Sequence, residues 1–413
     1  MPTLVKIATA LILCTASVYA ADWPQWRGSK QNGISPDNLP LSPLKAKSGP
    51  KVLWKANVGP GCSSFAVVGN RVYTMGNGEK DAEDQDIGSI YCLNASTGAV
   101  VWKHTFPSKL DPRAFEGGQC ATPTVDGDRV YALSRQGLFF CLNKDTGAVV
   151  WSKNFLTDFG TKLLDWSYTG SALVLGNAVF MDVGGKGASS VAFDKKTGDV
   201  IWQAGDDRQS YSTPYAFMQK GKQSVAFYNE YGLVVRNAAD GEETLRFAWK
   251  NDGEVNAAIP IAADGKIFIS CAYSLGPVLL PLDSAEPKPI WQNRKLRNKI
   301  NSSVLWKGHL YGFDESALTC MVFATGEVKW QQDGLGMASL IISGDGKLII
   351  QAEKGDLVIA EATPKAYKEL ARVEAAVPNR SWVAPVLANG KLFCGDNSGN
   401  ITVLNVSLPK ASK

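Results

Sequence analysis

The sequence has only two histidines, His104 and His309, among 413 residues. This scarcity argues against a histidine general base and against a metal site built from several histidines. The chain also lacks a Cys-x-x-Cys-His haem attachment, a Gly-x-Ser-x-Gly nucleophile elbow and a phosphate-binding loop. We therefore predict no catalytic residues and no metal site from motifs.

Strong charge and long apolar runs are also missing. The formal net charge of +4 is too small to argue for nucleic acid or an anionic membrane as a partner. Apart from the N-terminus, no apolar run is long enough to span a bilayer. We expect neither a nucleic-acid partner nor a membrane span.

Residues 1–20 have the three-part pattern of a secretory signal peptide. Lys6 precedes an apolar run, Ile7 to Leu13, and Val18-Tyr19-Ala20 stands before Ala21. The pattern predicts cleavage after Ala20 and a periplasmic or secreted protein. Cys14 leaves a lipoprotein open as an alternative, although Leu13 stands where a lipoprotein signal needs a small residue.

The chain repeats a tight-turn glycine followed by a short strand eight times. The glycines are 38 to 58 residues apart: Gly69, Gly127, Gly176, Gly221, Gly265, Gly308, Gly346 and Gly390. Short strands in repeats of this length are typical of a propeller. We predict an all-β fold, an eight-bladed β-propeller of four-stranded antiparallel blades.

Each repeat is expected to close with a bulky residue that fills the wedge between neighbouring blades. Seven tryptophans and, in the seventh repeat, Leu370 are assigned to this position: Trp54, Trp102, Trp151, Trp202, Trp249, Trp291 and Trp330. Residues 51–54 form an unmatched strand, and the last repeat lacks an outer strand of its own. An N-terminal strand that closes the ring would pair both open edges.

These features divide the chain into a signal peptide at 1–20, an N-terminal strap at 21–50, the propeller at 51–406 and a polar tail at 407–413. Without Cys14, seven cysteines remain and cannot all pair. Cys62 and Cys120 both lie seven residues before a turn glycine, so they occupy equivalent places in adjacent repeats. A disulfide and two free thiols both remain open there.

Candidate binding residues come from the loops on one face of the ring, because function in such folds lies in loops on a rigid scaffold. The loop at 293–301 is basic, and the insertion at 78–86 is acidic. Either the two loops dock a partner by charge, or both are merely solvated. The candidates are Trp166, Tyr168, Tyr211, Glu254, Asn256, Arg294, Arg297, Lys299, Asn301, Arg380 and Trp382.

The segment from Ala192 to Trp202, AFDKKTGDVIW, resembles the docking motif of pyrroloquinoline quinone (PQQ) repeat propellers, Ala-x-Asp-x-x-Thr-Gly-x-x-x-Trp. Partial copies end at Trp102, Trp151, Trp291 and Trp330, and residues 22–28 resemble the strap of this superfamily. The resemblance implies eight blades. It does not imply the cofactor, because the motif builds blades.

Two branches of the superfamily imply different functions. Quinoprotein alcohol dehydrogenases bind PQQ with calcium, stack it against a tryptophan and a disulfide of adjacent cysteines, and use an aspartate base. This chain is shorter, has no Cys-Cys pair and matches no calcium-ligand set. The BamB-like branch is a non-catalytic docking scaffold, from which this chain departs in lacking a lipobox.

We therefore expect a non-catalytic propeller without a cofactor that binds a protein partner or ligand through its loop face. The alternative is a PQQ-dependent oxidoreductase with PQQ and calcium in the central channel. An enzyme acting on a sugar or polymer remains a third possibility. The sequence does not indicate the oligomeric state.

Overall fold

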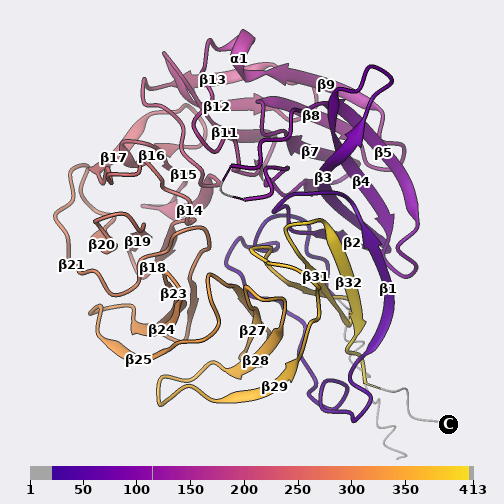
Figure 1. Cartoon of the computed structure of the whole chain (residues 1–413). Coiled ribbons are helices and arrows are strands. Elements are labelled where there is room, and N and C mark those ends of the chain that lie inside the picture. The colour runs from indigo at the N-terminus through magenta and orange to yellow at the C-terminus, as the bar shows by residue number, and fades with distance from the viewer. Residues whose placement is uncertain (1–20, 114, 409–413) are drawn as a thin grey trace, which may run out of the picture.

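The computed structural model describes residues 21–113 and 115–408, and these form eight four-stranded antiparallel sheets arranged in a ring (Figure 1). The predicted eight-bladed propeller is confirmed. The predicted signal peptide and residues 409–413 of the predicted tail lie outside the described residues. Within the described part of the chain, the helix α1 (Phe155–Asp158) is a single turn, and no helix has the length and apolarity to cross a membrane.

The first four blades follow one another along the chain. They are β2 (Ala66–Val68), β3 (Arg71–Lys80), β4 (Asp86–Asn94) and β5 (Val100–Pro107); β6 (Thr124–Asp126), β7 (Arg129–Leu133), β8 (Leu138–Asn143) and β9 (Val149–Asn154); β10 (Leu173–Leu175), β11 (Ala178–Gly185), β12 (Ala188–Asp194) and β13 (Val200–Ala204); and β14 (Tyr215–Gln219), β15 (Lys222–Tyr228), β16 (Gly232–Asn237) and β17 (Glu243–Ala248).

Blades 5 to 8 continue the ring. They are β18 (Ile261–Ala263), β19 (Lys266–Ser270), β20 (Pro277–Pro281) and β21 (Trp291–Gln292); β22 (Val304–Trp306), β23 (His309–Asp314), β24 (Ala317–Val322) and β25 (Val328–Gln332); β26 (Ser339–Ile342), β27 (Lys347–Gln351), β28 (Leu357–Glu361) and β29 (Glu369–Val373); and β30 (Val386–Ala388), β31 (Lys391–Gly395) and β32 (Asn400–Asn405), completed by β1 (Lys51–Asn57).

The ring closes as the unmatched N-terminal strand predicted. β1 pairs antiparallel with β32, and Trp54 lies opposite Val403. The first strand of the ring is thus the outer strand of its last blade (Figure 1). This pairing covers the edge that β32 would otherwise expose.

A tryptophan in the outer strand of a blade docks onto a turn of the next blade. Trp102 Nε1 donates to the carbonyl of Lys144 at 2.8 Å, and its ring packs on Gly147 so closely that a Cβ there would lie 2.7 Å from it. The glycine has φ +73°, which other residues rarely adopt. The Thr-Gly turn and the tryptophan therefore form one unit across neighbouring blades.

Two of the predicted wedge residues are wrong. In blade 4, Leu245 pairs with Val235 at the position that a tryptophan takes in other blades, and Trp249 lies beyond the end of β17. Trp249 is eight residues after Gly241, whereas the docking tryptophans follow their glycines by four. In blade 7, the bulge before Ala371 puts Ala371, rather than Leu370, in that register.

The core is a series of apolar layers between adjacent blades. Tyr73 of β3 and Leu142 of β8, for example, share one buried cluster, and Phe139 of β8 and Phe193 of β12 share the next. Both layers contain residues from two neighbouring sheets, so a blade does not bury its faces alone. The ring is consequently rigid, and its loops can be held in place.

Residues 21–39, the first part of the predicted strap, run across the face that carries the first hairpin turn of each blade. Trp23 exchanges two backbone hydrogen bonds with Val67 of blade 1. Arg27 is buried and donates to the carbonyls of Ser302 and Ser303 in blade 6, at 3.3 and 2.5 Å. The strap also bonds blades 2, 4, 7 and 8 through Val125, Pro214, Ile342 and Leu387. It therefore ties together blades that are distant in sequence.

Candidate functional site

The loops that lead into the inner strands, here called the inner-strand loops, surround a cavity of about 420 Å³ on the face opposite the strap. This volume is within the usual range for small-molecule sites. Trp26 of the strap contributes to its lining, so the strap supplies the floor. The described lining residues are Trp26, Cys62, Phe115, Cys120, Thr122, Trp166, Thr169, Ser171, Tyr211, Thr213, Val255, Ala257, Tyr273, Lys299, Ile300, Met337, Arg380 and Trp382.

Hydroxyl groups at the starts of the inner strands hold this wall together. The backbone N–H of Ser64 donates to Thr122 Oγ1 at 3.1 Å, that of Thr122 donates to Ser171 Oγ at 2.9 Å, and that of Ser171 donates to Thr213 Oγ1 at 2.9 Å. Each bond joins a blade to the next one. The belt satisfies backbone donors that have no sheet partner at the channel.

Three aromatic rings from different blades meet beside the cavity. The Phe115 ring lies 6.0 Å from the Trp166 ring and 6.3 Å from the Trp382 ring, measured between centroids. Phe115 precedes β6, Trp166 precedes β10 and Trp382 precedes β30. Such rings offer flat apolar faces to a ligand.

The charged side chains in the lining are cations. Lys299 Nζ lies 5.4 Å from the Tyr273 ring centroid, and among the described residues no carboxylate is within ion-pair distance of it. The Arg380 guanidinium lies 4.7 Å from the Trp382 ring and pairs with Glu116 at 2.9 Å. The cavity therefore combines aromatic faces with positive charge, which favours a flat anion.

The loop that carries Phe115 is anchored from below by Arg135. This buried guanidinium donates to the Gly117 carbonyl and, at 3.3 Å, to Ser167 Oγ. Burial lowers the pKa of Arg135. An arginine guanidinium keeps its positive charge in proteins.

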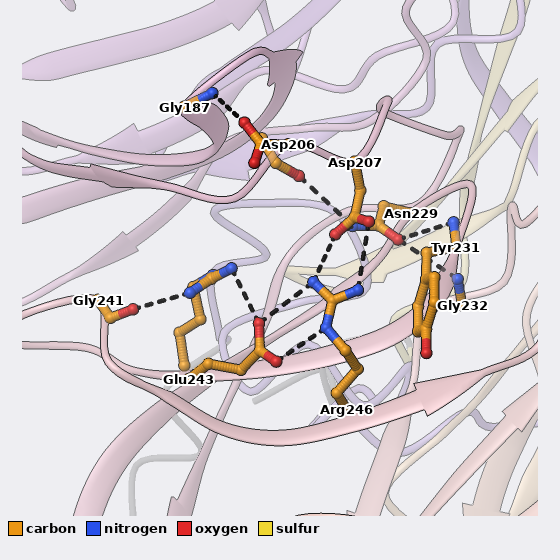
Figure 2. A network of polar contacts seen from close by, with 11 residues as sticks. Gly187, Asp206, Asp207, Asn229, Tyr231, Gly232, Gly241, Glu243 and Arg246 are labelled. Carbon is orange, nitrogen blue, oxygen red and sulfur yellow. Dashed lines mark hydrogen bonds and ion pairs between the residues drawn. The ribbon is translucent and has the colours of Figure 1, made fainter.

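The rim between blades 3 and 4 carries an internal ion network (Figure 2). Arg246 bonds Asp207 at 2.8 and 3.2 Å and Glu243 at 2.8 Å, and its guanidinium lies 4.3 Å from the Tyr231 ring. The bond to Asp207 raises the pKa of Arg246. These charges hold loops together and are not free for a partner.

The predicted candidates divide into three groups. Trp166, Tyr211, Lys299, Arg380 and Trp382 line the cavity together. Tyr168, Asn256 and Asn301 are buried; the Tyr168 hydroxyl donates to the Val183 carbonyl at 2.7 Å, and Asn301 lines a separate small void beside the strap. These three hold the scaffold in place.

The remaining candidates lie outside the cavity. Glu254 pairs with Lys250 at 3.3 Å, and Arg297 pairs with Asp314 at 2.7 Å and with Glu315 at 2.8 Å. Arg294 is exposed. Because Arg297 is neutralised locally, the loop at 293–301 is less basic than its composition implies.

Sequence reasoning missed several lining residues, above all Phe115, Tyr273, Trp26 and Met337. Phe115 and Tyr273 are aromatic residues outside the repeat pattern, which is the same signal that indicated Trp166 and Trp382. Cys62 and Cys120 were recognised as equivalent positions, but not as part of a cavity wall. No signal in the sequence identified Trp26 as a floor residue.

Comparisons with known proteins address the family and the fold. A family model described as outer membrane protein assembly factor BamB matches residues 86–332. A comparison with curated protein sequences finds no match.

Several solved structures resemble the chain. A europium-containing methanol dehydrogenase aligns with a TM-score of 0.63 at 10% identity, over 91% of this chain and 89% of that one. A quinohemoprotein alcohol dehydrogenase from Pseudomonas putida HK5 aligns with a TM-score of 0.62 at 12% identity, over 95% and 81%. BamB from Moraxella catarrhalis covers 86% of this chain and 99% of its own at 14% identity, with a TM-score of 0.44. At these identities the two dehydrogenase alignments establish the fold alone.

Proposed function

We propose, from the premise that this chain belongs to the family described as outer membrane protein assembly factor BamB, that it is a secreted or periplasmic binding propeller. Its loop face takes a small, flat, anionic ligand into the channel cavity. The observation that carries this proposal is the meeting of Trp166, Phe115 and Trp382 beside two cations, Lys299 and Arg380, in one cavity of about 420 Å³. The location rests on the signal-peptide pattern of residues 1–20.

The cavity is preformed for ligand binding. The cavity wall is held by the hydroxyl belt, and its floor by the strap. A rigid site loses little freedom when a ligand binds. A ring system would lie against the aromatic faces, and its carboxylates would approach Lys299 and, after exchange with Glu116, Arg380.

A titration of the mature chain tests the proposal. The probe is a naphthalene dicarboxylate, compared with the uncharged naphthalene dicarboxamide by calorimetry. We expect saturable binding of the dicarboxylate and weaker binding of the dicarboxamide. W382A is expected to weaken the dicarboxylate about tenfold, and K299Q about threefold or more, through loss of stacking and of charge.

Two matched controls lie on the opposite side of the molecule. Lys307 Nζ stands 5.4 Å from the Trp306 ring, the same cation–aromatic distance as Lys299 and Tyr273, but neither residue lines the cavity. W306A and K307Q should leave affinity unchanged. Equal binding of dicarboxylate and dicarboxamide, or equal effects of both lysine variants, would contradict the proposal. Absence of binding would favour a protein partner at the loop face.

The second candidate is a PQQ-dependent oxidoreductase. PQQ is a flat quinone with carboxylates, so the aromatic rings and the two cations fit its ring system. A bound quinone would serve as an electron acceptor. Within the described residues, no group of three or more His, Cys, Asp or Glu converges. Calcium prefers a cluster of carboxylates, so these residues fit calcium less well than they fit the quinone. PQQ binding with reduction of an electron acceptor in the presence of alcohol would favour this candidate; PQQ binding without turnover would favour the binding propeller.

A further inference from the structure

We infer that Cys62 and Cys120 are a reversible dithiol–disulfide pair in the wall of the channel cavity, and that their oxidation state sets ligand affinity there. The first part depends only on the two cysteines. The second rests on the proposed function, because it requires a ligand in the cavity.

The two cysteines are neighbours across the gap between blades 1 and 2. Gly61 and Gln119, the residues immediately before them, form a parallel bridge, and the Cys62 N–H donates to the Gln119 carbonyl at 2.7 Å. Adjacent strands lie about 4.7–4.9 Å apart, which is within the Cα separations of disulfides, about 4.4–6.8 Å. Both side chains line the cavity. The pairing thus needs no large backbone movement.

The surroundings distinguish one sulfur as the nucleophile. The nearby Cys120 sulfur raises the pKa of Cys62, and the nearby Cys62 sulfur lowers the pKa of Cys120. The positive charge of Arg135 also lowers the pKa of Cys120. A thiolate is the reactive form of cysteine, so Cys120 reacts first.

The other described cysteines differ from this pair. Cys92, Cys141, Cys271, Cys320 and Cys394 are buried, whereas Cys62 and Cys120 are partly exposed. Burial raises the pKa of Cys92 to about 11 and that of Cys394 to about 12. Buried, apolar thiols of this kind are inert. Selective oxidation of the cavity pair is therefore expected.

The reaction is thiol–disulfide exchange with a small-molecule disulfide as oxidant. The Cys120 thiolate attacks one sulfur of that disulfide, forms a mixed disulfide and releases one thiol after protonation. The Cys62 sulfur, having lost its proton to water, then attacks Cys120 Sγ and releases the second thiol. The protein loses two thiols, and the external disulfide becomes two thiols.

The disulfide would act on the ligand site through the loop that precedes Cys120. Glu116 lies four residues before Cys120 in the same loop and pairs with Arg380 across the cavity mouth. Glu116 Oε2 is buried without a hydrogen-bond partner within the described part of the chain. A disulfide removes both thiol donors from this region and fixes the loop that presents Phe115 and Glu116.

The first test needs no variant. The mature chain is incubated with oxidised glutathione, and a second sample with dithiothreitol; both are alkylated, digested and mapped by mass spectrometry. We expect a cross-linked peptide containing Cys62 and Cys120 only in the oxidised sample, with loss of two of the seven described thiols. Alkylation of both cysteines after oxidation would overturn the inference, as would a cross-link between any other pair.

The second test measures affinity for the naphthalene dicarboxylate in both samples. We expect the affinities to differ by about threefold or more in wild type and in C394S, the buried-thiol control, but not in C62S or C120S. Equal affinities in cross-linked and reduced wild type would overturn the link to ligand binding. A cross-link without any dicarboxylate binding would leave the disulfide established and would contradict the proposed function instead.

Discussion

Among single side chains, Asp182 in β11 has an environment that opposes its charge. It is buried, its Oδ2 accepts from the Ser210 N–H at 3.0 Å, and its Oδ1 has no partner among the described residues. Burial raises the pKa of Asp182 from 3.8 to about 7, and nearby Asp207 adds to the shift. The folded chain therefore holds this proton more tightly than the unfolded chain does.

This shift predicts a pH-dependent stability cost. The protonated Asp182 carboxyl contributes to the free energy of unfolding. This contribution is complete below the unfolded pKa near 3.8 and is lost as pH rises to about 7. D182N removes the charge, so at pH 8 the variant should be more stable than wild type by about 2–4 kcal/mol, with a smaller gain at pH 5. Urea unfolding at both pH values measures the difference. D128N, at an exposed aspartate, is the control, and a D182N effect that is the same at both pH values would refute the assignment.

At the level of strands and turns, the contact between a docking tryptophan and its glycine can be isolated by two alanine substitutions. Gly241 has φ +77°, and a Cβ there would lie 2.7 Å from the Trp202 ring; Gly221 has φ +78° and no atom within 4 Å of its Cβ position. Both substitutions strain the backbone alike, but only G241A displaces an indole. We expect G241A to cost about 1–3 kcal/mol more than G221A in urea unfolding. Equal costs would show that the free energy of unfolding does not depend on the contact between Trp202 and Gly241.

The regularity of these elements also explains what the sequence could predict. Turn glycines recur because hairpin turns need positive φ, so the eight blades and the closing strand were readable from spacing. The interval between tryptophans points to Trp249, whereas the four-residue offset from Gly241 points to Leu245, which holds the docking position. The spacing between repeats identifies the blades, whereas the number of residues after the turn glycine identifies the docking residue.

The site was less predictable because its loops do not repeat. Trp166 and Trp382 stood out as aromatics that the blade pattern did not need, and both line the cavity. Asn256 and Asn301 stood out equally, yet both are buried in the scaffold. Only the closed ring brings residues such as Phe115 and Trp382, 267 positions apart, within 6.3 Å.

For the molecule as a whole, the N-terminal segment performs two separable tasks. The strap bonds to blades on several sides of the ring and supplies Trp26 to the cavity floor, whereas β1 completes the last blade. Removing the strap should therefore affect the cavity, and removing β1 as well should affect closure. The two tasks can be told apart by where a shortened chain begins.

A chain that begins at Lys51 retains β1 and should remain a closed ring with a lower Tm and weakened dicarboxylate binding. R27Q tests the same contacts within the complete mature chain, since it removes a buried cation from the Ser302 and Ser303 carbonyls. We expect it to lower the free energy of unfolding by about 2–4 kcal/mol.

A chain that begins at Val58 leaves β32 as an exposed edge, which pairs readily with other edges. Sedimentation should then show association together with loss of cooperative unfolding. If that chain has the same sedimentation behaviour and Tm as the chain beginning at Lys51, the ring does not depend on β1 for closure.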